Sequence, residues 1–321
     1  MRKQRLLNFN TAMKNRFKGK VYRLALSSGA SCPNRDGKVG YGGCIFCSEG
    51  GSGEFAVEND GMDVSRQIEC AKSKVENKVR AAKARDEFAG YVAYYQSFTN
   101  TYYRNEEELE RFRKLYTEAI ESPEVVALSI GTRPDCIDDK ILTMLKDLKS
   151  VKPVWVELGL QSANDETGRF INRGYDTSVY DEAVKKLHGI GVEIITHVIV
   201  GLPNEDDDDV IETVRHVVKV SKETRPSGWV NESDGIKISL LYVLENTLLA
   251  GMISNGKCSM NEYTLEGYGC ILQKLLEIIP DDMVVHRITG DPPKKLLISP
   301  KWTTDKKKVL NYLNSLHLFD K

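Results

Sequence analysis

Long hydrophobic runs are missing from this sequence of 321 residues. No apolar stretch reaches the length of a membrane span, and the N-terminal segment MRKQRLLNFNTAMKNRFKGK lacks the apolar core of a signal peptide. The seven cysteines are an odd number without the regular spacing of a disulfide framework. These absences argue against a membrane or secreted protein. We therefore expect a cytoplasmic protein whose reduced thiols are free to bind a metal.

Three other features are absent: the glycine motif GxGxxG after the first predicted strand, internal repeats and low-complexity linkers. Without the glycine motif, a dinucleotide-binding fold explains the chain poorly. The composition is ordinary, with 41% hydrophobic and 28% charged residues. The length is enough for one large core, or for a barrel with a small appendage.

Acidic residues are missing from one end of the chain. Residues 1–35 contain nine Lys and Arg and no Asp or Glu, and residues 284–321 contain eight Lys and Arg against three Asp. The net charge is nonetheless only −1, so the middle of the chain is acidic overall. Basic ends on a near-neutral protein predict contact with a polyanion such as RNA. The alternative is that they only keep the surface soluble.

Short β-branched runs alternate with longer helical stretches along the chain. Six runs have the length and the Val, Ile and Tyr content of buried parallel strands: 21–28, 91–96, 125–130, 154–160, 192–200 and 236–243. Helical stretches lie at about 63–86, 105–121, 138–149, 177–189, 206–221 and 260–279. This order predicts an α/β fold with a parallel sheet, either an open doubly wound sheet or a partial (β/α)6 TIM-like barrel, which we favour.

The sequence changes in character after about residue 255. The stretch TGDPPKKLLISPKW is followed there by a Lys-rich helical segment, DKKKVLNYLNSL. We therefore predict a core barrel with a basic N-terminal segment over residues 1–255. A small C-terminal extension over residues 256–321 is a candidate for binding substrate or RNA.

The segment CPNRDGKVGYGGCIFC, from Cys32 to Cys47, places three cysteines and four glycines in sixteen residues. It begins just after the first predicted strand, at the edge of the sheet where ligands bind in such folds. The glycines let the backbone wrap closely around a ligand. The CxxC spacing of Cys44 and Cys47 lets two thiolates reach one metal centre. Residues 32–47, here named the cysteine loop, are therefore the candidate metal site.

Two kinds of metal site fit the cysteine loop. A structural zinc needs four ligands, and the fourth would have to be Cys70 or a distant histidine. An iron–sulfur cluster held by three cysteines leaves one iron open to a ligand, as a catalytic site requires. A third alternative is that the cysteines are merely buried as small apolar residues. We treat Cys70, Cys136, Cys258 and Cys270 as packing residues.

Two motifs, SCPNRDG…GGCIFCSEGGSGEF and HRITGDPPKKLLISPKW, carry a specific resemblance that covers nearly the whole chain. The chain resembles the radical S-adenosylmethionine (radical SAM) superfamily, of the YhcC/YtqA type. It is more distantly similar to the Elongator catalytic subunit and to oxygen-independent coproporphyrinogen oxidase. Most of the superfamily places three residues between the first two cysteines, whereas eleven separate Cys32 from Cys44. The YhcC/YtqA type shares the longer spacing, so the spacing points to this subfamily within the superfamily.

The resemblance implies a set of cofactors and their chemistry. Cys32, Cys44 and Cys47 would ligate a 4Fe-4S cluster, whose open iron binds the amino and carboxylate groups of S-adenosylmethionine. One-electron reduction by a donor such as flavodoxin or ferredoxin cleaves the sulfonium, giving methionine and a 5′-deoxyadenosyl radical that abstracts hydrogen from the substrate. The protein supplies position, electrostatics and exclusion of water, while the cofactor supplies the difficult step.

Five further residues match positions that contact S-adenosylmethionine in relatives. Phe46 matches an aromatic residue near the adenine, and Thr99, in QSFTNT, lies where relatives bind the methionine amino group. Gln161 matches a contact to the ribose, and Arg173, twelve residues later, matches a contact to the carboxylate. His197 aligns with a cofactor contact beside GLP. Simpler structural roles are the alternatives. Phe46 would be an apolar plug and Thr99 part of a polar turn. Arg173 would be a charge on a helix surface, and His197 a core histidine.

Two other motifs have simple structural explanations. In IGTRPD, Gly131 replaces a glutamate that would contact the cofactor in the Elongator subunit, and Arg133 and Asp135 either line the rim or pair with each other. In NEDDDD, residues 204–209, we expect Asn204 to cap a helix whose first turn carries the acids. We prefer this explanation to a metal site, since consecutive carboxylates repel one another.

The resemblance also suggests a substrate. It implies modification of the tRNA wobble uridine, with conversion of a 5-carboxymethylaminomethyl group toward the aminomethyl form, and the basic ends are compatible with a tRNA partner. Two alternatives stay open: a zinc-stabilised, non-catalytic RNA-binding protein, and a radical SAM enzyme that acts on a small metabolite or tetrapyrrole. The sequence assigns no catalytic residue and predicts no membrane partner.

Overall fold

The computed structural model describes residues 6–51, 56–57, 61–229 and 233–319. Its strands are β1 (Leu7–Asn8), β2 (Lys20–Leu26), β3 (Phe88–Tyr95), β4 (Val125–Thr132), β5 (Val154–Gln161), β6 (Glu193–Val200), β7 (Gly235–Leu240), β8 (Val243–Leu244), β9 (Val284–Arg287) and β10 (Leu297–Ser299). Its α-helices are α1 (Phe9–Phe17), α2 (Val64–Lys83), α3 (Glu106–Glu121), α4 (Asp139–Val151), α5 (Asp165–Phe170), α6 (Thr177–Gly189), α7 (Asp207–Thr224), α8 (Leu248–Ser254), α9 (Leu265–Ile278) and α10 (Lys306–Ser315).

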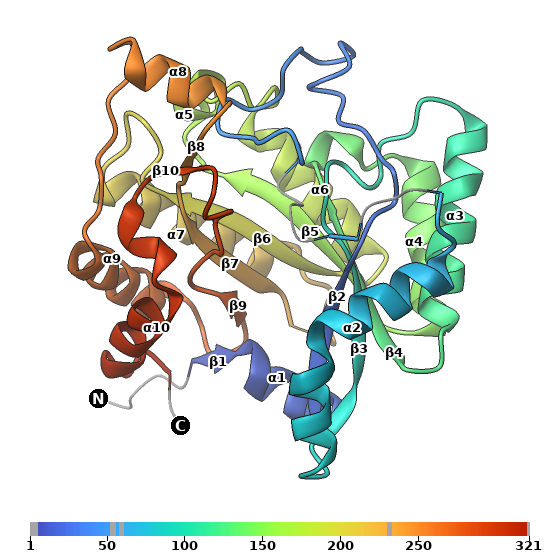
Figure 1. The fold of residues 1–321 in the computed structure, drawn as a ribbon. Helices are drawn as coiled ribbons and strands as arrows, with labels where there is room; N and C mark the ends of the chain where they lie inside the picture. Colours follow the sequence, from blue (N-terminus) through green and yellow to red (C-terminus); the bar gives the residue numbers. More distant parts are fainter. Residues whose placement is uncertain (1–5, 52–55, 58–60, 230–232, 320–321) are drawn as a thin grey trace.

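Parallel strands form one curled sheet in the order β1-β9-β7-β6-β5-β4-β3-β2, with helices along its outer face (Figure 1). The predicted α/β class and partial barrel are confirmed. The six predicted strands correspond to β2 through β7, and the predicted helical stretches correspond to α2, α3, α4, α6, α7 and α9. The strands read as apolar runs because helices cover one face of the sheet and side chains fill the other.

The two ends of the chain complete the barrel. Strand β9 pairs with β7 on one side and with β1 on the other, so a strand from beyond residue 255 belongs to the main sheet. Val309 and Leu313 of α10 are buried in the main hydrophobic core. The division into residues 1–255 and 256–321 stays a prediction, but the extension packs on the barrel as part of one core.

Inward-facing side chains fill the barrel in tiers, because alternate residues of a strand point to the same face. The lowest tier is apolar and packs on α1: Val21, Val92, Ala127, Trp155, Ile195 and Val284. Two residues further along the strands, the middle tier is polar: Arg23, Tyr94, Ser129, Glu157, His197 and Lys237. Two residues further again, the upper tier contains the small residues Ala25, Gly131, Gly159 and Ser239, together with Gln96 and Ile199. Small residues leave room for a ligand near the carboxyl ends of the strands.

Figure 1 shows the cysteine loop at the top of the barrel and α1 at the bottom. Arg23 of β2 reaches His286 of β9 across the open seam of the barrel, with 3.0 Å between Nη2 and Nδ1. The seam is therefore closed at the middle tier. Among the described helices, none is long and apolar enough to cross a membrane.

Candidate functional site

The cysteine loop follows β2 and lies at the carboxyl ends of the strands (Figure 1). The Arg35 N–H donates to the Cys32 carbonyl at 2.8 Å, and the Cys47 N–H donates to the Cys44 carbonyl at 2.9 Å. Gly43 has a left-handed backbone with φ of 83°, and a Cβ at this position would lie 3.0 Å from Arg35 Nε. Glycine is therefore needed at position 43 both for the turn and for the arginine side chain.

The chain after α5 clamps the cysteine loop. The Ile45 N–H donates to the Ile171 carbonyl at 3.0 Å, and Asn34 Nδ2 donates to the Asn172 carbonyl at 2.6 Å. Asn172 Nδ2 in turn donates to the Gly43 carbonyl at 2.8 Å. These reciprocal bonds join two segments that lie far apart in the sequence, and they hold the thiols in place.

Two of the three partly exposed thiols have hydrogen-bond donors beside them. Arg35 Nη2 donates to Cys47 Sγ at 3.1 Å, and Asn34 Nδ2 lies 3.9 Å from Cys44 Sγ. Burial raises the pKa of the Cys44 thiol to about 12, and the charges of Cys47 and Cys32 add to the rise. Neighbouring thiolates that repel one another in this way need a cationic partner, which a metal centre supplies.

The donor set fits an iron–sulfur cluster better than a zinc ion. A zinc ion draws four ligands to one point, with Zn–S distances of about 2.3 Å. Within the described ranges, no three Cys, His, Asp or Glu side chains converge in that way. A cubane instead attaches each thiolate to a different iron and leaves one iron without a protein ligand. Three thiols on one loop, two of them beside a hydrogen-bond donor, suit that arrangement.

Replacing Arg35 with glutamine is expected to lower the reduction potential of the cluster. The guanidinium beside Cys47 favours the more negative, reduced state, and a loss of about 1.4 kcal/mol of that preference is about 59 mV in a one-electron couple. A potentiometric titration followed by EPR measures the shift, with Arg35→Lys as the comparison that keeps the charge. A potential equal to that of the wild type would show that Arg35 only ties the loop to the carbonyls of Ser48 and Glu49.

The turn after β3 brings Thr99 beside the start of the cysteine loop. Thr99 is buried, and its N–H donates to the Ser31 carbonyl at 3.1 Å. The adjacent Phe98 N–H donates to the Gly51 carbonyl at 3.1 Å, so the turn contacts the chain on both sides of the loop. This position is compatible with a contact to the methionine amino group, which stays a prediction.

Asn100 is a structural residue of the site that sequence reasoning missed. Its buried Nδ2 donates to the carbonyls of Tyr95, Ser97 and Gly131 at 3.1, 3.1 and 2.8 Å, and its Oδ1 accepts from Ser28 Oγ at 2.5 Å. One side chain thus joins the segments that leave β2, β3 and β4 and forms the rim beneath the loop. The available signal was an Asn in a polar run directly after a buried strand.

Gln161 ends β5 with a left-handed backbone, at φ of 63°. The Tyr175 hydroxyl lies 3.4 Å from Gln161 Oε1 and also donates to the Gly159 carbonyl. Arg133 and Arg173 both lie over the Tyr175 ring, 4.8 and 4.7 Å from its centroid. Gln161 is thereby held at the upper tier, and its contact with the ribose stays a prediction.

The Arg173 side chain is bound inside the protein, and its predicted contact with the cofactor carboxylate stays a prediction. Its side chain is fully buried. The five N–H donors are all used inside the protein, Nε by the Tyr175 carbonyl at 2.9 Å, Nη1 by the carbonyls of Leu160 and Ser162 at 2.8 and 2.5 Å, and Nη2 by Asp165 and Thr177 at 2.9 and 3.3 Å. A fork with a ligand would therefore require the guanidinium to release some of these partners. With these bonds in place, Arg173 positions the chain that clamps the cysteine loop.

Arg133 and Asp135 pair with each other, as one of the two alternatives predicted. Arg133 Nε and Nη2 lie 2.9 and 2.7 Å from the two carboxylate oxygens of Asp135. The remaining Nη1 donates to the Arg173 carbonyl at 2.9 Å. The charge of Arg133 also opposes the rise in the pKa of Cys44, which places the guanidinium near the thiols. Arg133 therefore links the turn after β4 to the clamp of the cysteine loop.

His197 belongs to the polar middle tier and is 35% exposed, with its Nε2 2.7 Å from Glu157 Oε2. The buried Glu157 also accepts bonds from Tyr94 and Ser129, both at 2.8 Å, and from the Lys237 ammonium group. Burial lowers the pKa of His197, and the bond to Glu157 opposes that change. A neutral imidazole held through Nε2 keeps Nδ1 for a ligand. Contact with the cofactor stays a prediction, and the carboxylate that orients the ring was missed.

Phe46 packs on an apolar cluster beneath the cysteine loop. The buried members of this cluster are Ile45, Ile171, Leu202, Leu241, Val243 and Leu249. The Leu249 N–H donates to the Ile45 carbonyl at 2.8 Å, so α8 holds the same segment. Phe46 therefore serves as an apolar plug. Its predicted contact with the adenine is compatible with that role and stays a prediction.

Asn204 does not cap α7, and that prediction was wrong. Asp206 is the N-cap: its carboxylate accepts from the N–H groups of Asp208 and Asp209 at 2.8 and 3.3 Å, and the Asp209 carboxylate accepts from the Asp206 N–H at 3.1 Å. Asn204 instead has a left-handed backbone, at φ of 66°. Glu205 is the buried acid of this run, and burial raises its pKa to about 7.

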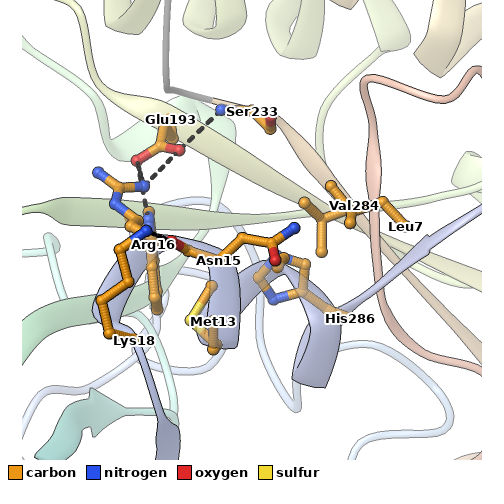
Figure 2. Close-up of a pocket in the computed structure, with 11 residues that line it drawn as sticks. Leu7, Met13, Asn15, Arg16, Lys18, Glu193, Ser233, Val284 and His286 are labelled. Atoms are coloured by element: carbon orange, nitrogen blue, oxygen red, sulfur yellow. Dashed lines mark hydrogen bonds and ion pairs between the residues drawn. The ribbon is translucent and has the colours of Figure 1, made fainter. Parts of the chain in front are cut away.

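A pocket of about 360 Å³ lies at the opposite end of the barrel (Figure 2). Its lining comes from α1 and from the amino ends of β5, β6 and β9. Arg16 Nη1 lies 2.8 and 2.7 Å from the two carboxylate oxygens of Glu193, and Trp155 Nε1 donates to the same carboxylate at 2.9 Å. Because ligands bind at the carboxyl ends of the strands in such folds, we do not assign catalysis to this pocket.

Comparisons with known proteins assign most of the chain to two family models. The model of the radical SAM superfamily matches residues 31–217, and the model of the radical SAM C-terminal domain matches residues 233–316. The chain is 37% identical to YtqA of Bacillus subtilis over 311 residues, which are 97% of this chain and 89% of that protein. It is 32% identical to YhcC of Escherichia coli over 304 residues, which are 94% of this chain and 89% of that protein.

A solved structure of Elp3 from the archaeon Methanocaldococcus infernus shares the fold. The TM-score is 0.62 at 18% sequence identity, and the match covers 94% of this chain and 64% of that chain. Residues 31–217, which the radical SAM model matches, include the three cysteines and the clamp described above. The chain therefore belongs to the radical SAM superfamily, whose enzymes use a 4Fe-4S cluster and S-adenosylmethionine.

Proposed function

We propose that this radical SAM enzyme modifies the wobble uridine of tRNA and converts a 5-carboxymethylaminomethyl group toward the aminomethyl form. Support comes from the motifs that resemble the Elongator catalytic subunit and from the fold shared with archaeal Elp3. At 18% identity a shared fold does not define a substrate. The RNA partner is therefore inferred from the surface of this chain.

Three exposed lysines carry the proposal of an RNA partner. Lys306, Lys307 and Lys308 occupy the first turn of α10, where the helix dipole favours acidic residues. Lys306 pairs with Asp291 at 2.7 Å, and no ion pair within the described part of the chain involves Lys307 or Lys308. Each misplaced charge costs about 0.3–1 kcal/mol of helix stability. Contact with RNA phosphates explains why the lysines are placed there.

In this proposal the cysteine loop holds the cluster, and the upper tier of the barrel receives the cofactor and the target nucleotide. S-adenosylmethionine supplies the radical that abstracts hydrogen from the substrate. The proposed cofactor contacts are Phe46, Thr99, Gln161 and His197, with His197 oriented by Glu157. These side chains position the reacting groups, and the clamped loop excludes water from them.

The electron donor, which we propose is a flavodoxin or ferredoxin, would approach the outer side of the cysteine loop. Val39 and Tyr41 of this loop are 45% and 79% exposed, and Lys38 beside them is exposed as well. Exposed apolar side chains next to a charge suit a transient protein contact. The distance from the donor to the cluster would be short, because the cluster thiols belong to the same loop.

Nucleoside analysis of total tRNA tests the proposed substrate. Cells without this gene should accumulate 5-carboxymethylaminomethyluridine, with or without a 2-thio group, and lose its aminomethyl derivatives. The reconstituted enzyme with S-adenosylmethionine and a reductant should carry out the same conversion on isolated tRNA. Unchanged nucleosides in both assays would leave a small metabolite or a tetrapyrrole as the substrate.

Neutralising Lys306, Lys307 and Lys308 together is expected to weaken tRNA binding without changing which tRNA is preferred. For every lysine that binds a phosphate in the wild type, its neutralisation should flatten the slope of log K against log salt by about 0.9 on duplex RNA, or by about 0.7 on a single strand. Up to three phosphates are involved. The salt dependence of the affinity, measured by fluorescence anisotropy, checks this prediction.

A matched control removes the same charge elsewhere on the molecule. Lys185, Lys186 and Lys219 are exposed on α6 and α7, and their triple substitution should leave the salt slope at the wild-type value. If the α10 variant also keeps the wild-type slope, these lysines are solubilising surface and RNA binds elsewhere.

A further inference from the structure

The motif HRITGDPP has no role in the steps described so far, yet it ends β9 inside the barrel. Arg287 of this motif is in register with Lys237 of β7, which is in register with His197 of β6. The register of β7 and β9 shifts between Ile236 and Lys237, and this irregularity brings Arg287 opposite Lys237. The charge of Arg287 acts on both Lys237 and His197, so the three side chains lie near one another across β6, β7 and β9, at the level of the polar middle tier.

These side chains and their surroundings carry more positive than negative charge. Glu157 supplies the carboxylate of the tier, and it is shared by Lys237 and His197. Arg23 is partly buried in the same tier and bonds a histidine of β9 instead of an acid. Burial lowers the pKa of Lys237 to about 7, and the charges of Arg23 and Arg287 act in the same direction. The middle tier therefore holds more basic groups than carboxylates.

Arg287 is the accessible cation of this interior. Its side chain is 34% exposed, close to the 35% of His197, whereas Lys237 is 5% exposed. Arg287 Nε donates to the Thr289 carbonyl, and Nη2 lies 3.5 Å from an oxygen of Asp291. That carboxylate binds a lysine of α10 more closely, and Arg287 Nη1 has no partner among the residues described. The guanidinium thus keeps donors for a ligand.

We propose that Arg287 binds a carboxylate of the substrate, in the place that Asp291 partly fills, and holds the reacting group over the upper tier beside His197. This inference rests on the proposed function, in which the target uridine carries a carboxymethylamino group. An arginine fork suits a carboxylate because two parallel N–H donors meet two oxygens. A phosphate of the RNA offers similar chemistry, so the test has to change the carboxylate alone.

The test combines a change in the enzyme with a change in the substrate. Anticodon stem-loop RNA carrying 5-carboxymethylaminomethyluridine is compared with its methyl ester, on wild-type enzyme and on Arg287→Gln. The wild type should prefer the acid over the ester by about 10- to 150-fold in kcat/KM, the range expected for a hydrogen bond to a charged group. In Arg287→Gln that ratio should fall to near one. Arg215→Gln, on the exposed face of α7, should keep the wild-type ratio.

Each outcome decides the question. A wild-type enzyme that treats acid and ester alike overturns the inference, and so does an Arg287→Gln variant that keeps the preference. An equal decrease in kcat/KM on acid and ester in this variant would assign Arg287 to a phosphate or to the fold, and would also overturn it. If Arg287→Gln does not fold, Arg287→Lys, which keeps the charge without the fork, should show an intermediate ratio. A wild-type enzyme that converts neither RNA overturns the proposed function itself, and the inference with it.

Discussion

Cys44→Ala is expected to yield a folded protein that holds almost no iron–sulfur cluster and does not cleave S-adenosylmethionine. Two thiolates hold a cubane poorly, because one of its three protein-bound irons loses its ligand. Cys44 also lies at the centre of the set, since the charges of both Cys47 and Cys32 raise its pKa. Iron and sulfide content after anaerobic reconstitution, together with the visible absorbance, measures the effect.

Two further cysteines provide the controls. Cys70 is exposed on α2, and Cys70→Ala should load a full cluster. Cys136 is the more demanding control, because the charge of Cys32 contributes to the raised pKa of its thiol and the two groups are therefore neighbours. A fourth ligand of a zinc site would have to come from this region. If Cys136→Ala strips the metal and the wild-type protein contains zinc, the iron–sulfur assignment is wrong.

The central strands could be predicted from the sequence because their signal is local. Each is a short apolar run bounded by helical stretches. An uninterrupted apolar run indicates a strand that is buried on both faces. Strands β1 and β9 carry no such signal. They are two and four residues long, and their pairing joins Leu7 to Val284 across nearly the whole chain. The closure of the barrel by the two chain ends was therefore beyond a local pattern.

The role of the cysteines could likewise be predicted from a local pattern, whereas the contacts of Arg173 depend on the folded structure. The thiols are ligands by residue type, so their spacing along one loop predicts a metal site directly. The carbonyl acceptors of Arg173 belong to Leu160, Ser162 and Tyr175, and any residue at those positions would offer the same oxygen. Such an arrangement exists only once the turn has folded. The match of spacing with relatives predicts a contact of Arg173 with the cofactor, but it could not predict the internal partners of the side chain.

One missed feature did have a signal in the sequence. Glu157 stands in the apolar run VWVELGL and Lys237 in the apolar run IKISLL, and a charge inside a buried strand needs an opposite charge nearby. Two such residues on strands of one barrel predict a buried pair. The structure places them in contact and adds His197 to the same carboxylate. The buried pair could thus have been predicted from the sequence, whereas the contact of His197 with the same carboxylate needed the structure.

Arg173→Ala is expected to lower the free energy of unfolding of the metal-free protein by about 3–5 kcal/mol, the cost of removing one partner of a buried charged network. The substitution leaves Leu160, Ser162 and Tyr175 with buried carbonyls that lose their donor, and it leaves Asp165 without its ion pair. Because the segment after α5 that Arg173 positions also clamps the cysteine loop, cluster loading should fall as well. Denaturant unfolding and iron content measure the two effects.

A neighbouring arginine gives the matched control. Arg169 is 64% exposed and lies 3.5 Å from Asp176, so Arg169→Ala should cost less than about 1 kcal/mol and leave cluster loading unchanged. One result for Arg173→Ala would contradict its role in the clamp. If Arg173→Ala keeps wild-type stability and a full cluster but binds S-adenosylmethionine about 10- to 150-fold more weakly, the guanidinium releases its internal partners when the cofactor binds and contacts the carboxylate directly. A decrease in stability and loading without that selective decrease in affinity assigns Arg173 to the clamp.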